Sequence, residues 1–173
     1  MILKLDELLT KKEIKKSNNI DKITDKIYLG DIEGATDFNY FKREQIHNVI
    51  SIVNEPPEYP EEMKINQKSF KIEDRYNYNI IQYFKECIDF IENSDKIYIH
   101  CLFGISRSAT IVISYLMWKT HSNFEDTYNF VKKRRPKVEP NNGFISQLKQ
   151  FETLLKNNNY KLENINFKSI IIK

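Results

Sequence analysis

Cys101 and Arg107 are the residues whose types and spacing in this sequence could do covalent chemistry. They stand in the segment HCLFGISRS, residues 100–108, between a short apolar strand expected over 96–100 and an apolar helix expected over 109–118. Anions bind at such a strand-to-helix junction because backbone N–H groups and the positive end of the helix dipole meet there. The same groups stabilise a thiolate, so we expect Cys101 to be a nucleophile.

The residues between the cysteine and the arginine can form an anion cradle, since their backbone N–H groups can surround a tetrahedral dianion. These residues are Leu102, Phe103, Gly104, Ile105 and Ser106. Gly104 permits the turn that aims the amides inward, and the planar guanidinium of Arg107 can hold two oxygens of the anion. A nucleophile inside such a cradle is typical of attack on phosphorus. The alternative is a buried structural cysteine beside a structural arginine.

Apolar patterning predicts strands alternating with helices around this segment. Strands are expected over 26–29, 47–53, 69–72 and 96–100, and helices over 36–45, 80–92, 109–118, 122–134 and 141–155. Ser122 and Glu125 fit a capping box at the start of one helix. The alternation predicts an α/β fold, with a central, mostly parallel sheet flanked by helices.

The length of 173 residues predicts one domain. Residues 1–23 are interpreted as an N-terminal helical arm, with an amphipathic helix over 2–16. Residues 24–156 are interpreted as the catalytic domain and residues 157–173 as a C-terminal tail.

The charge, the cysteine count and the lack of long apolar runs argue against several classes of function. A net charge of +3, with acids and bases interleaved, does not favour nucleic acid as a partner. Two cysteines make neither a disulfide framework nor a zinc site, and no metal ligands converge. The absence of a signal peptide and of a long apolar run predicts a cytoplasmic protein, with the nucleus as a second location, and no membrane partner.

The signature segment resembles that of the cysteine-dependent protein tyrosine phosphatases. Gly104 to Ala109 is similar to the dual-specificity phosphatases in particular, and the likeness extends over about residues 24–156. It includes Ile27–Gly30, Ala35, Val49–Val53, Asp89–Ile91, Arg134–Pro136, Pro140–Asn141, Gly143–Phe144 and Gln147–Leu148. The resemblance implies a small protein phosphatase without a kinase-docking domain. It would hydrolyse phosphotyrosine and phosphoserine or phosphothreonine through a cysteinyl-phosphate, without metal or cofactor.

The resemblance also implies a general acid on a loop before the signature strand. Asp74 and Glu73 are the candidates, and the family places its aspartate two residues after the last apolar residue of a strand, here Ile72. This favours Asp74, which would protonate the leaving oxygen and then activate water. The alternative is a solvated acidic turn.

Supporting roles fall to four further residues. Ser108 can donate its hydroxyl to the Cys101 sulfur, or it can be simply the first polar residue of the helix. His100 would orient the loop from behind, and Asn141 belongs to the shared pattern as a supporting residue. Cys87 is interpreted as a small buried hydrophobe; the alternative is a redox partner that traps oxidised Cys101 as a disulfide.

Substrate class remains open between alternatives. Leu102, Phe103 and Ile105 are apolar, which disfavours phosphoinositides, and the small net charge disfavours RNA 5′-triphosphates. A catalytically weak phosphoprotein-binding module is the alternative outside enzymes. The run Lys132–Lys137 is interpreted as a solvated helix end, with a nuclear signal as the alternative. The partner is expected to be a phosphorylated protein, and the chain a monomer or a weak homodimer through its arm.

Overall fold

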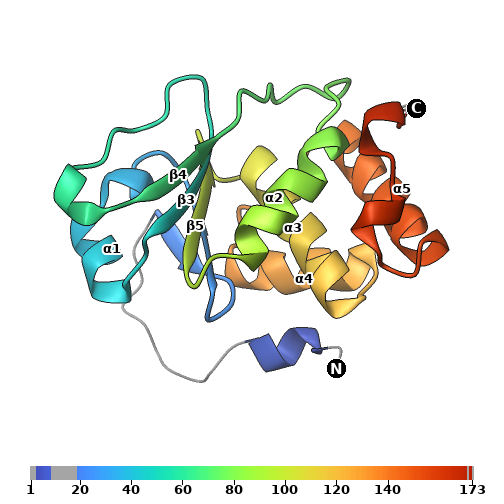
Figure 1. The fold of residues 1–173 in the computed structure, drawn as a ribbon, viewed down its shortest axis with the longest axis horizontal. Coiled ribbons are helices and arrows are strands. Elements are labelled where there is room, and N and C mark those ends of the chain that lie inside the picture. Colours follow the sequence, from blue (N-terminus) through green and yellow to red (C-terminus); the bar gives the residue numbers. More distant parts are fainter. Residues whose placement is uncertain (1–2, 9–18, 171, 173) are drawn as a thin grey trace.

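The computed structural model describes residues 3–8, 19–170 and 172, which form a five-stranded sheet with helices on both faces (Figure 1). The strands are β1 (Ile20–Lys22), β2 (Ile27–Gly30), β3 (Asn48–Ile52), β4 (Asn66–Ser69) and β5 (Ile97–Cys101). Their order is β1-β2-β5-β3-β4, and only β1 pairs antiparallel among them. The predicted mostly parallel α/β fold is confirmed.

Five α-helices accompany the sheet in the described part of the chain. They are α1 (Phe38–Glu44), α2 (Phe84–Glu92), α3 (Arg107–Thr120), α4 (Phe124–Arg134) and α5 (Asn142–Asn157). Short 3-10 turns occur at Leu5–Leu8, Gly34–Thr36, Glu61–Met63, Ile81–Tyr83, Leu162–Asn164 and Phe167–Ser169. In Figure 1, α1 lies on one side of the sheet and the other four helices lie on the opposite side.

The two faces of the sheet are set by strand alternation. Tyr28, Val49 and Tyr98 share one face and pack with α1. Their strand neighbours are aliphatic and pack with α2, α3 and α5 on the other face: Ile27, Leu29, Ile50, Ile52, Ile97 and Ile99. Because side chains alternate along a strand, the near-continuous apolar runs of the sequence bury on both faces.

Helix α3 is the central helix of the larger layer. Every residue from Ser108 to Met117 is buried, as its apolar sequence predicts. The hydroxyls of Thr110 and Thr120 donate to carbonyl oxygens four residues earlier, at 2.8 and 2.7 Å, so these polar side chains are satisfied inside the core. Since α3 begins directly at Arg107, its packing fixes the position of the signature segment.

The strand expected over 69–72 is wrong by three residues. The observed strand β4 spans Asn66–Ser69 at the edge of the sheet. Its side chains are polar and none is buried, so it carries no apolar pattern. Backbone pairing and two side-chain hydrogen bonds, from Asn66 to Asn48 and from Gln67 to Ser51, hold it to β3. Phe70 and Ile72, which suggested the strand, are buried in the extended segment that follows.

The expected capping box is also wrong. Asn123, not Ser122, caps α4, and its side chain accepts a hydrogen bond from the Asp126 N–H at 2.8 Å. His121 takes a left-handed conformation with φ of 55° to close α3, which places Ser122 within the connection between the helices.

The two terminal segments contact the rest of the fold where the structure describes them. The expected helix over 2–16 lies largely outside the described residues, and Leu5–Leu8 form a single turn. Strand β1, at the end of the expected arm, pairs with β2. Three residues of the expected tail, Leu162, Ile165 and Phe167, are buried in the core. The division into arm, catalytic domain and tail stays a prediction.

Candidate active site

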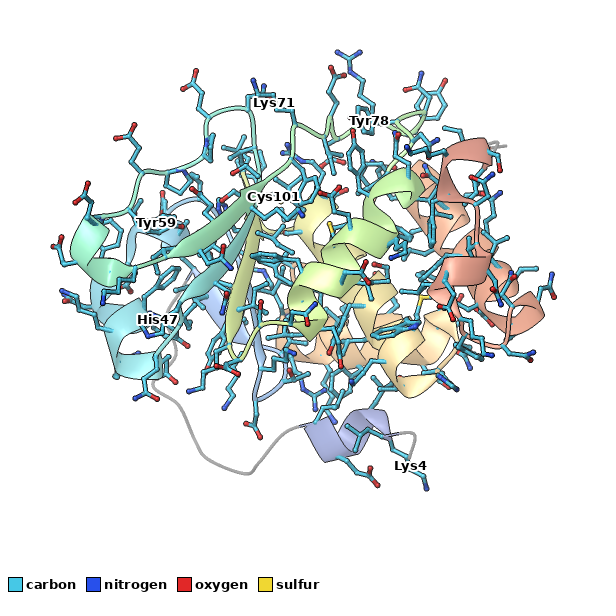
Figure 2. All side chains as sticks on the ribbon, in the orientation of Figure 1. Lys4, His47, Tyr59, Lys71, Tyr78 and Cys101 are labelled. Carbon is cyan, nitrogen blue, oxygen red and sulfur yellow. The ribbon has the colours of Figure 1, made fainter. Side chains whose placement is uncertain are left out.

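Cys101 ends β5 at the carboxyl edge of the sheet, and Figure 2 labels it there beneath the segment that carries Lys71 and Tyr78. Its side chain is 1% exposed. The Sγ atom accepts hydrogen bonds from the Gly104 N–H and the Ser108 hydroxyl, each at 3.2 Å. Two donors aimed at one sulfur stabilise a thiolate. The contact expected between Ser108 and the sulfur is therefore present.

The loop after Cys101 turns its carbonyl groups outward. Leu102 O accepts from Ile32 N–H, Phe103 O and Gly104 O from the Arg135 guanidinium, and Ile105 O from Glu139 N–H, at 2.8–3.3 Å. In a trans peptide the N–H of the next residue points the opposite way. The amides of residues 103–106 therefore face the concave side. Gly104 makes this turn with φ of +64°, and a side chain there would collide with Arg135 and Gly30.

Arg107 follows this concavity in the chain, and its guanidinium is fixed by two carbonyl groups. Its Nη1 donates to Ile52 O at 3.3 Å and to Ile72 O at 3.2 Å, which ties the guanidinium to the end of β3 and to the extended segment after β4. Its Nε is buried and makes no hydrogen bond within the described residues. A buried, charged donor without a hydrogen-bond acceptor is costly unless a ligand supplies one. An oxyanion bound in the cradle would supply the acceptor that Arg107 Nε lacks.

Asp74 lies beside Arg107, across the mouth of the loop. Its Oδ1 accepts from the Ser106 hydroxyl at 2.6 Å and from Asn141 Nδ2 at 2.8 Å. Its Oδ2 is 3.9 Å from Arg107 Nε. Asn141 also caps α5 by accepting from the N–H of Phe144, so the helix position and the carboxylate position depend on one residue.

Glu73, the alternative carboxylate, points elsewhere. Its Oε2 pairs with Arg75 Nε at 2.9 Å, and both side chains are more than half exposed. The geometry thus brings Asp74, and not Glu73, to the site.

His100 lies behind the loop, as expected. Its Nε2 is 2.7 Å from Ser51 Oγ, which also accepts from Gln67 Nε2 at 2.8 Å. The Cys101 carbonyl oxygen lies 3.3 Å from Nδ1 and can only accept, so Nδ1 carries the proton and, in a neutral ring, Nε2 accepts from the Ser51 hydroxyl. Burial lowers the pKa of His100 to about 4, so the ring is neutral at physiological pH.

Cys87 is fully buried in the apolar core of α2, and burial raises the pKa of its thiol well above the ordinary value. A thiol kept protonated is a poor nucleophile, so the geometry favours the small-hydrophobe interpretation. Both cysteines are free thiols. The redox role stays a prediction that the structure does not favour.

Arg135 is a site residue that the sequence interpretation missed, because it was read as part of a solvated basic helix end. It is completely buried. Its Nη1 pairs with Asp21 of β1 at 2.8 Å, and its Nη2 lies 3.7 Å from Asp31. Since the same guanidinium donates to Gly104 O and Phe103 O, Arg135 ties the loop to β1 and to the end of β2. No periodic pattern in the sequence indicates that Arg135 contacts the loop of Phe103 and Gly104.

Within the described residues, no group of three or more histidine, cysteine, aspartate or glutamate side chains could hold a metal ion. No helix in that part of the chain is long and apolar enough to cross a bilayer.

Comparisons with known proteins find dual specificity phosphatases. A probable dual specificity protein phosphatase of Dictyostelium discoideum is 39% identical over 137 residues, 77% of this chain and 63% of that protein. The dual specificity protein phosphatase 1B of Arabidopsis thaliana is 32% identical over 157 residues, 88% of this chain and 93% of that protein. The crystal structure of DUSP15 matches with a TM-score of 0.77 and 31% identity, covering 87% of this chain and 99% of that one.

Four Dictyostelium relatives are longer than this chain, which spans 16–63% of their lengths. The model of the dual specificity phosphatase catalytic domain matches residues 27–154, and this range contains both the cradle and Asp74. The chain therefore belongs to the dual specificity phosphatase catalytic domain family.

Proposed function

We propose that this chain is a metal-independent protein phosphatase that hydrolyses phosphate monoesters through a cysteinyl-phosphate. The observation that carries the proposal is the position of Cys101 Sγ at the base of inward-facing amides, in a loop that leads into Arg107, whose Nε makes no hydrogen bond within the described residues. In the first step, the thiolate attacks phosphorus and the S–P bond forms as the bond from phosphorus to the leaving oxygen breaks. Asp74, in its protonated form, gives its proton to that oxygen.

The second step releases phosphate. Asp74, now a carboxylate, takes a proton from water as the water oxygen attacks phosphorus, and the S–P bond breaks. The Ser108 hydroxyl, 3.2 Å from the sulfur, stabilises the departing thiolate. Arg107 and the loop amides hold the phosphoryl oxygens through both steps.

The proposed substrates are phosphotyrosine and phosphoserine or phosphothreonine in proteins. Family membership supports both classes, as do the apolar loop side chains of Leu102 and Phe103, which are exposed at the rim of the site. A head group with several phosphates would need cations at these positions. A phosphoprotein-binding module remains the second candidate, but it would not need Asp74 beside the cradle.

The cellular setting is also proposed. A cytoplasmic location fits the absence of a bilayer-spanning helix in the described part of the chain, and fluorescence microscopy of the tagged protein tests it. The expected state is a monomer or a weak homodimer, which sedimentation over a range of concentrations would measure.

The function is tested by hydrolysis of an aryl phosphate and of phosphotyrosine and phosphothreonine peptides. The intact protein should release phosphate from all three without added metal, and Cys101→Ser should not. Tight peptide binding without turnover by the intact protein would contradict the enzyme and support the binding module.

A further inference from the structure

A groove adjoins the phosphate cradle at the carboxyl ends of β2, β3 and β5. It has a volume of about 370 Å³, and its lining residues are Ile32, Val53, Asn54, Glu55, Leu102 and Arg107. Because Arg107 also lines the cradle, the groove is continuous with the site where the phosphorylated residue would sit. Its walls are apolar on the side of Ile32 and Leu102 and anionic at Glu55.

Glu55 begins an acidic loop between β3 and β4, which arches away from the sheet in Figure 1. Residues 54–63 contain four glutamates and no lysine or arginine, although the whole chain has a net charge of +3. The glutamates are Glu55, Glu58, Glu61 and Glu62, and all four are exposed. In the described ranges, none of the four carboxylates forms an ion pair with a cation of the chain.

The acidic loop is fixed to the body of the domain. The Tyr59 ring, labelled in Figure 2, stacks on Phe41 of α1 with centroids 6.0 Å apart. The side chain of Gln67 donates to Pro57 O at 3.2 Å, and Met63 is buried. The Glu55 carboxylate is therefore presented at the groove by an anchored loop, which lowers the entropy cost of engaging it.

We infer that this groove binds a lysine or arginine side chain of the phosphoprotein substrate, next to the phosphorylated residue. This inference rests on the proposed function. The aliphatic stem would lie on Ile32, Val53 and Leu102, and the cationic head would meet Glu55. The phosphate dianion neutralises Arg107 when substrate is bound, so Arg107 does not repel the cation. An acidic residue or a second phosphate at the same place meets the Glu55 carboxylate, while the charge of Arg107 is already offset by the bound phosphate.

The experiment compares phosphotyrosine peptides that differ only in the residues flanking the phosphotyrosine, which are lysine, leucine or glutamate. The quantity measured is the ratio of kcat/KM for the lysine peptide to kcat/KM for the glutamate peptide. For an exposed pair, we expect a ratio of about three- to tenfold at low ionic strength, which falls as salt is added. Glu55→Gln should bring the ratio toward one, and Glu55→Lys should invert it.

Glu163→Gln is the matched control, because Glu163 is an exposed glutamate in the turn Leu162–Asn164, outside the groove. It should keep the ratio of the unaltered protein. The same ratio is measured as peptide Kd with Cys101→Ser, which reports on the groove even without turnover.

Two outcomes separate the two proposals. Hydrolysis of all peptides with a ratio of one, or a ratio that Glu55→Lys leaves unchanged, overturns the groove assignment and leaves the phosphatase intact. Absence of hydrolysis with a charge-dependent Kd ratio contradicts the phosphatase and supports the groove.

Discussion

Cys101 and Cys87 are equally buried, yet their surroundings are opposite. Cys87 lies among apolar side chains on α2, and burial raises the pKa of its thiol. Cys101 lies at the end of β5, where Gly104 N–H and the Ser108 hydroxyl both donate to its sulfur. Burial alone does not decide the chemistry of a thiol; the donors that face it do.

The two cysteines also differ in what the residues around each sulfur must do. Around Cys87 only packing is required, so many apolar residues would serve. Around Cys101 the loop must turn its amides inward, and Arg135 on its outer side accomplishes this by binding Gly104 O and Phe103 O. Substitutions of the residues around each sulfur therefore test the distinction between the two cysteine sites.

The largest expected contrast is in alkylation. Iodoacetate at neutral pH should modify Cys101 faster than Cys87 by about 10³-fold, because only the thiolate reacts and the cradle attracts the carboxylate. Inorganic phosphate should protect Cys101. Peptide mass mapping over time gives both rates. Equal alkylation rates, or a faster reaction at Cys87, would contradict the claim that Cys101 is the reactive thiol and Cys87 a structural one.

Removal of Asp74, the proposed general acid, is expected to give the next largest effect. Asp74→Asn should lower kcat by about 10²-fold for peptides, whose leaving oxygen needs a proton, and by less for activated aryl phosphates. Glu73→Gln is the matched control and should retain kcat, because Glu73 pairs with Arg75. Steady-state kinetics measures both variants. A loss confined to Glu73→Gln would identify the other carboxylate as the acid.

His100 resembles Cys87 in being a buried group held uncharged, which predicts a pH dependence of stability. Its pKa is about 4 in the folded chain and about 6.5 when unfolded, so the unfolded state binds the proton more readily. Stability is thus complete above pH 6.5 and falls between pH 6.5 and 4. From pH 7.5 to pH 5 the intact protein should lose about 2 kcal/mol more than His100→Asn.

Urea unfolding at the two pH values measures that difference. An identical loss in the intact protein and the variant would show that His100 is not the group responsible.

The smallest expected effect comes from substitution of Arg135, which binds the loop carbonyl groups of Phe103 and Gly104 from the outside. Arg135→Lys keeps the charge but loses the planar fork, so both the alkylation rate of Cys101 and kcat/KM should fall by about tenfold. Arg134→Lys is the control from the same basic run. If Arg135→Lys lowered thermal stability without changing the Cys101 alkylation rate, its role would be structural only.

Local patterns were sufficient to predict the site core and the central helices. Cys101, Arg107 and Ser108 are close in sequence, and the apolar run of α3 has no other stable environment than a core. Strand β4 could not be predicted, since its polar side chains give no apolar alternation and its partners in β3 are distant in the sequence. Arg135 could not be placed either, because its partner Asp21 is 114 residues away and its charge suggested solvent.

The central claim is that Cys101 carries the phosphoryl group between the two steps. It is tested most directly by quenching the Ser108→Ala variant in acid during turnover and mapping the modified peptide by mass spectrometry. The loss of the Ser108 hydroxyl should slow the second step, so one phosphoryl group should accumulate on Cys101. Turnover with no phosphoryl group on Cys101, or with one on another residue, would contradict the account.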